Sequence, residues 1–144
     1  MAAEPGRGME AWVTLHRAHS RTLLELSRRM EAERGVSVLE HGALYEVLTA
    51  AARRLRMGEL AERLGTSPSA TTRLVDRLVA RGWIQRNAPP ENRRTIVVSI
   101  TGDGRRAYVR NNPPFMAAVE DALADRLHEG EMTQLVKLLN KLCR

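Results

Sequence analysis

Small polar and basic side chains share one face of the helix expected between Ser67 and Arg81. At 100° per residue, Ser69, Thr72 and Arg73 point to the same side of that helix. Short hydroxyl side chains let a helix approach base edges in the major groove, where an arginine can donate two hydrogen bonds to guanine. The pattern predicts contact with double-stranded DNA, and the alternative is a merely solvated polar face. The candidate DNA-contacting residues of this helix are Ser67, Ser69, Thr71, Thr72, Arg73 and Arg77.

Two further arginines, Arg93 and Arg94, follow the turn of an expected hairpin. Residues 83–86 have the pattern of a short strand, residues 88–92 that of a turn, and residues 95–100 that of a β-branched return strand. Paired arginines at the tip of a hairpin fit a narrow minor groove or its flanking phosphates. We therefore count both arginines among the candidate DNA contacts.

The net charge of +6 is concentrated in the middle of the 144-residue chain. Residues 53–106 contain twelve arginines and five acidic residues, which gives this stretch +7, whereas the rest of the chain carries −1. A segment with this charge attracts a polyanion, and the counterions released from phosphates drive the binding. The alternative is a solvated basic surface in a protein that favours arginine.

The helix that carries these residues belongs to an expected helix-turn-helix. A short helix at residues 57–64 is closed by Gly65, and Ser67 with Pro68 begins the next helix. The opposite face of the second helix is largely apolar, so we expect it to pack on the first helix. The residues of this packing face are Thr71, Leu74, Val75 and Leu78.

Longer helices flank this module. Apolar residues recur at steps of three and four in residues 10–34, and Ser37 caps a second helix at residues 38–52. A further helix follows Thr101, and the Asn-Asn-Pro-Pro of residues 111–114 is expected to break or kink it. A leucine-rich helical region ends the chain. The long apolar stripes at both ends predict a homodimer, with folding back onto the chain's own module as the alternative.

These elements predict a mainly α fold with a small β-hairpin wing (α+β). The architecture is a winged helix-turn-helix with long N- and C-terminal dimerisation helices. We expect a disordered lead-in at residues 1–8 and a helical dimerisation region at residues 9–36 and 102–144. The winged helix-turn-helix DNA-binding domain is expected at residues 37–101.

Several classes of protein have no support in the sequence. No apolar run approaches the roughly 20 residues of a membrane helix, and no export signal is visible, so we expect a cytoplasmic protein without a membrane partner. No catalytic set of side chains stands out, so neither an enzyme nor a cofactor is expected. His16 and His19 lack a nearby carboxylate or thiolate pair, so we expect no metal site. Cys143 has no second cysteine in the chain to pair with.

Two alternatives stay open. One is a redox or metal sensor with the same fold, and the other is a protein-interaction module without specific DNA binding.

Five blocks of the sequence together resemble the MarR family of bacterial transcription regulators, and their order and spacing carry the resemblance. The blocks are Met57–Ala61, Thr71–Leu78, Arg81–Arg86, Asn92–Arg94 and Ile100–Gly104.

The resemblance implies a homodimer with two winged modules, each reading half of a palindrome. Ser67, Ser69, Thr72 and Arg73 would lie in the major groove, Arg77 near phosphate and wing, and Arg94 in the minor groove. Members usually repress a neighbouring gene and release DNA when a small, often phenolic, anion binds. The partners implied are double-stranded DNA, a second copy of the chain and a small aromatic or anionic effector. The effector cleft would be lined by Arg17, Val38 and His41.

The wing departs from the family pattern. Pro89 and Asn92 stand where members usually have aspartates. Asn92 can accept a hydrogen bond but cannot form an ion pair with Arg77, and Glu91 is a substitute from one position away.

Overall fold

The computed structural model describes residues 6–143 and divides the chain into two compact units. One unit spans residues 34–113, and the other combines the segments before and after it. The expected boundaries of the winged module were residues 37–101. Residues 1–5 of the expected disordered lead-in lie outside the described part of the chain. Arg7 and Gly8 were expected in that lead-in but already belong to the first helix.

In the central unit, α2 (Val38–Thr49) begins at a capping box. Ser37 Oγ accepts a hydrogen bond from the backbone N–H of Glu40, and the Glu40 carboxylate accepts one from the N–H of Ser37, both at 3.0 Å. The expected cap is therefore confirmed. The helix ends before the expected residue 52 because a 3-10 turn at Ala51–Arg53 redirects the chain into a strand.

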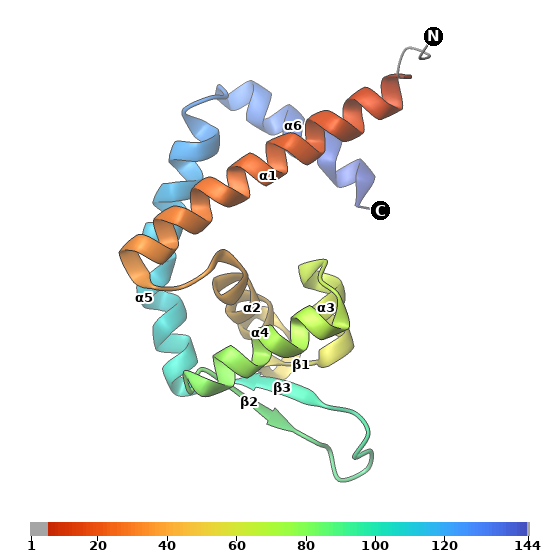
Figure 1. Ribbon diagram of the computed structural model, residues 1–144, viewed down its shortest axis with the longest axis vertical. Helices are drawn as coiled ribbons and strands as arrows, with labels where there is room; N and C mark the ends of the chain where they lie inside the picture. The colour runs from red at the N-terminus through yellow and green to blue at the C-terminus, as the bar shows by residue number, and fades with distance from the viewer. Residues whose placement is uncertain (1–5, 144) are drawn as a thin grey trace. The chain divides into compact units, whose positions relative to one another are not determined.

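The helix-turn-helix is formed by α3 (Met57–Leu64) and α4 (Pro68–Ala80) (Figure 1). Gly65 follows α3 with a φ of 62°, a left-handed conformation that glycine adopts without a steric penalty. Ser67 Oγ then accepts from the backbone N–H of Ala70 at 3.2 Å, so the expected cap of the second helix is also confirmed.

The wing is part of a three-stranded antiparallel sheet. Its strands are β1 (Arg54–Arg56), β2 (Ile84–Asn87) and β3 (Val97–Ile100), in the order β1-β3-β2. The expected hairpin is β2–β3, which projects from the helices of the central unit and ends in the loop of residues 88–96 (Figure 1). The strand β1 was not expected, because its three residues carry no periodic pattern and only their pairing with β3 makes them a strand.

The core of the central unit lies where α2, α3 and α4 meet the sheet. It is built mainly of small aliphatic side chains, as the chain's low aromatic content requires. Fully or nearly fully buried members include Leu44, Val47, Leu55, Leu60, Leu74, Val75, Leu78, Ile84, Val98 and Ile100. The mainly α fold with a small β wing is therefore confirmed.

Helix α5 (Gly102–Val119) passes through the Asn-Asn-Pro-Pro of residues 111–114, so the expected break does not occur. Pro114 lacks the N–H that would bond to the carbonyl of Arg110, four residues earlier. That carbonyl instead accepts a hydrogen bond from Arg34 Nη2 at 2.6 Å. The substitute donor satisfies the group that the proline leaves unpaired, which favours continuation of the helix.

The second unit contains α1 (Arg7–Arg34), a π-helical turn at Glu120–Ala124 and α6 (Glu129–Leu142). Ion pairs link α1 to the segment around the π-helical turn. Arg126 Nη2 lies 3.1 Å from Glu25 Oε2, and Arg29 pairs with Asp121. Although α6 is amphipathic, none of its described residues is buried within this chain.

Candidate nucleic-acid interface

One face of α4 is exposed and polar, while the other is fixed in the core. Ser69, Thr72 and Arg73 are exposed, whereas Leu74 and Leu78 are buried. A helix held by one face cannot rotate to hide the other. The structure therefore presents the small polar side chains and Arg73 together on the surface.

Thr71, which was among the predicted DNA contacts, does not belong to this exposed face. The residue is 1% exposed. Its hydroxyl donates to the carbonyl of Ser67 at 2.9 Å and lies 2.8 Å from Thr66 Oγ1. Thr71 thus stabilises the turn between α3 and α4 from within.

An ion pair connects the wing to α4. Arg86 on β2 places Nη2 2.6 Å from Asp76 Oδ1 and 3.3 Å from the carbonyl of Thr72. This contact holds the base of the hairpin against the polar face and neutralises its one acidic side chain. Sequence reasoning missed the pair, although an acid on a cationic face is a signal that a partner is needed.

The wing loop places both of its arginines at the surface. Arg93 and Arg94 are exposed. Asn92 Oδ1 accepts a hydrogen bond from the backbone N–H of Arg94 at 3.2 Å, a local turn that a short polar side chain can form. Asn92 therefore orders the loop. Arg94 and Thr72 line the same hollow, which lies between the wing and α4.

The partner of Arg77 is Glu40 on α2. Arg77 Nε lies 3.6 Å from Glu40 Oε1, and Arg81 Nη2 lies 3.5 Å from Glu40 Oε2. The Glu40 side chain is only 5% exposed. Sequence reasoning did not single out Glu40, although the Ser-x-x-Glu spacing from Ser37 could have identified it as a capping residue.

The three candidate effector residues lie on two helices. Arg17 is exposed on α1, in the other unit, while Val38 and His41 are in the first turn of α2. His41 is buried and stacks on Tyr108 with ring centroids 4.8 Å apart. Burial lowers the pKa of His41, and a 3.2 Å contact from its Nε2 to Asn112 Oδ1 opposes that shift. The neutral ring is thus favoured.

Within residues 6–143, no group of three or more His, Cys, Asp or Glu side chains is arranged to hold a metal ion. No helix in the described part of the chain combines the length and apolarity required to cross a membrane.

The exposed helix face, the turn before it and the arginine-tipped hairpin define a winged helix-turn-helix protein. A family model described as the MarR family matches residues 34–95. The multiple antibiotic resistance protein MarR of Salmonella typhimurium is 31% identical over 84 residues, which cover 58% of each chain. The match to the uncharacterized HTH-type transcriptional regulator YfiV of Bacillus subtilis covers 34% of that protein's length. The chain therefore matches only part of each of these two relatives. Over the winged helix-turn-helix region the chain is therefore similar to members of the MarR family.

Solved structures share the fold over nearly the whole chain. Sco3205 of Streptomyces coelicolor, a MarR family transcriptional regulator solved in complex with DNA, superposes with a TM-score of 0.86. It is 24% identical, and the match covers 99% of this chain and 90% of that one. BpsR of Bordetella bronchiseptica, whose DNA binding is regulated by 6-hydroxynicotinic acid, gives a TM-score of 0.82 at 18% identity, covering 94% and 99% of the two chains. At these identities the likeness shows the fold.

Proposed function

We propose that the protein is a sequence-specific, DNA-binding transcriptional regulator that acts as a homodimeric repressor. The observation that carries the proposal is the exposed face of α4, where Ser69, Thr72 and Arg73 stand beside an arginine-tipped wing. Small side chains permit close approach to the major groove, and an arginine can distinguish guanine. The match of residues 34–95 to the MarR family model and the DNA complex of the similar protein Sco3205 support the same conclusion.

Binding of the wild-type protein to genomic fragments tests the proposal. We expect selected fragments to share a palindrome whose half-site centres are about one helical turn, roughly 10 base pairs, apart. Gel shifts at low salt should then show tighter binding to these fragments than to mixed-sequence DNA. Equal binding to every duplex, or none to any, would contradict a sequence-specific regulator.

The wing arginine should supply affinity rather than sequence preference. We expect Arg94→Ala to weaken binding to all duplexes and to lower the slope of log K against log salt by about 0.9, the value for one lost phosphate contact. Fluorescence anisotropy across a salt series measures both quantities. An unchanged slope would show that Arg94 does not contact phosphate.

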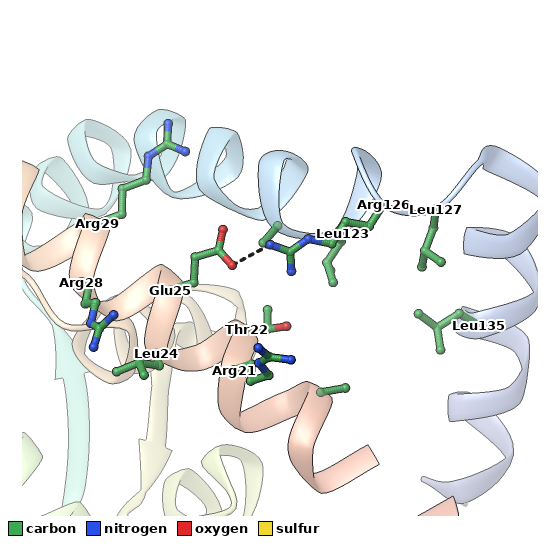
Figure 2. A pocket seen from close by; sticks show the side chains of 12 residues that line it. Arg21, Thr22, Leu24, Glu25, Arg28, Arg29, Leu123, Arg126, Leu127 and Leu135 are labelled. Carbon is green, nitrogen blue, oxygen red and sulfur yellow. Dashed lines mark hydrogen bonds and ion pairs between the residues drawn. The ribbon is translucent and has the colours of Figure 1, made fainter. Parts of the chain in front are cut away.

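A second copy of the chain is proposed as the partner of the terminal helices. Apolar side chains of α1 and α6 are strongly exposed, including Trp12 at 63% and Leu142 at 71%. A pocket in the same unit is lined by Leu123, Leu127 and Leu135, with arginines around it (Figure 2). Monomeric proteins rarely leave such an apolar surface in water, so its burial by a two-fold related copy is favoured.

Charging this surface should separate the subunits. Leu138 on α6 is 50% exposed, and we expect Leu138→Asp to weaken dimerisation at least about tenfold because the interface would bury an unpaired carboxylate. Sedimentation equilibrium should give twice 16.1 kDa for the wild type and a concentration-dependent lower mass for the variant. The matched control is Val79→Asp on α4, which is 38% exposed in the central unit and should leave the dimer intact. A wild-type monomer would exclude the homodimer.

Release of DNA by a small aromatic or anionic effector completes the proposal, with Arg17, Val38 and His41 as candidate contacts. The regulated DNA binding of BpsR supports it. A screen of small aromatic acids for loss of the gel shift tests this part.

A protein that regulates chromosomal genes works where the chromosome is, so we place it in the bacterial cytoplasm.

A further inference from the structure

We propose that Glu40 is a positioning residue that holds the side chain of Arg77. Its negative charge offsets part of the positive charge that Arg77 presents to DNA. This inference rests on the proposed DNA-binding function. Glu40 would thereby keep binding to non-specific duplexes weak, so that the bases read by the exposed face of α4 decide where the protein binds.

The geometry places one buried carboxylate beneath two arginines of α4. Glu40 Oε1 faces Arg77 Nε at 3.6 Å, while Oε2 accepts the N–H of Ser37 at 3.0 Å and lies 3.5 Å from Arg81 Nη2. The cap and the core fix the position of Glu40, whose side chain is 5% exposed. A charge held at low exposure is screened less by salt than a surface charge.

The two arginines differ in how much they depend on Glu40. Arg81 also donates to the carbonyl of Gly35 at 2.7 Å and stacks 4.7 Å from the centre of the Trp83 ring. Arg77 is 54% exposed, and among the described residues its guanidinium has Glu40 as its one recorded partner. Loss of the Glu40 charge should therefore release Arg77 and leave Arg81 in place.

Arg77 lies one helical turn after Arg73 on α4, on the edge of the proposed interface. A guanidinium paired with a carboxylate neutralises a phosphate less completely than an unpaired one, because the carboxylate repels the phosphate. Non-specific affinity depends on the number of phosphates neutralised. Glu40 should consequently lower non-specific affinity and the salt dependence together.

The test compares wild type with Glu40→Gln on a short duplex of mixed sequence across a salt series. Glutamine keeps an oxygen to accept the N–H of Ser37 but removes the charge. We expect binding about three- to eightfold tighter near 0.1 M salt and a log–log slope steeper by up to about 0.9. The effect should disappear in an Arg77→Gln background. Thermal unfolding of each variant verifies that the fold is intact.

The matched control is Glu46→Gln. Glu46 is a second carboxylate on α2, but it pairs with Arg63 on α3 at 3.3 Å. We expect this variant to change the slope little. Equal tightening by Glu46→Gln, an unchanged slope in Glu40→Gln, weaker binding, or an effect that persists without Arg77 would each overturn the inference. Wild-type protein that binds no duplex would instead overturn the proposed function, and the inference with it.

Discussion

Replacing Arg73 with alanine is expected to abolish most of the preference for the selected palindrome over mixed-sequence DNA. A bidentate contact to guanine contributes about 1–3 kcal/mol of discrimination, so specific binding should weaken roughly 10- to 100-fold per half-site. Binding to mixed-sequence duplexes should fall much less. Anisotropy titrations of both duplexes at one salt concentration measure the ratio.

Two companion variants separate base recognition from charge. Arg73→Lys keeps the positive charge but loses the planar fork, so it should lose sequence preference while retaining non-specific affinity. Arg105→Ala removes an exposed arginine of α5 outside the proposed interface and should retain the preference. If Arg73→Lys kept full preference, Arg73 would be a phosphate contact rather than a reader of bases.

Replacing Gly104 with alanine is expected to destabilise the central unit severely. A Cβ at this position would lie 2.1 Å from the carbonyl oxygen of Trp83 and 2.8 Å from Ile100 Cγ1. The first contact is with backbone, and the Trp83 carbonyl also accepts a hydrogen bond from Thr101. Relief therefore requires α5 to move away from the sheet. We expect a loss of about 3 kcal/mol or more in the free energy of unfolding.

Thermal unfolding followed by circular dichroism measures this loss as a fall in Tm of about 10 °C or more. The matched control is Gly58→Ala on α3, where nothing lies within 4 Å of an added Cβ. That variant should be neutral or stabilised by up to about 1 kcal/mol, because alanine favours a helix more than glycine does. A Gly104→Ala protein with the Tm of wild type would show that α5 does not pack against the Trp83 backbone, just before β2.

The elements read best from sequence were those whose signals act within a few residues. Ser37, Gly65 and Ser67 mark helix ends because capping groups bond to backbone only three or four positions away. The two faces of α4 follow from helical periodicity in the same way. The order of helix, turn, helix and hairpin could therefore be predicted without coordinates.

Features that depend on packing between distant segments could not be predicted. The strand β1 exists because β3 offers a partner. The burial of Thr71 depends on how α4 sits against the turn, and Pro114 is accepted because Arg34 reaches the carbonyl of Arg110. Each of these outcomes depends on a contact with another segment of the chain, which local sequence patterns do not predict.

The same distinction between local and long-range features applies to the candidate interface. By itself the sequence determined that small hydroxyls and Arg73 share one helix face and that two arginines follow the hairpin turn, because periodicity and turn chemistry are local. Only the tertiary structure decided that Arg86 neutralises Asp76 and that a buried Glu40 holds Arg77. Ion pairs between elements form only when packing brings the charges within a few ångströms, and the chain encodes that approach only through the whole fold.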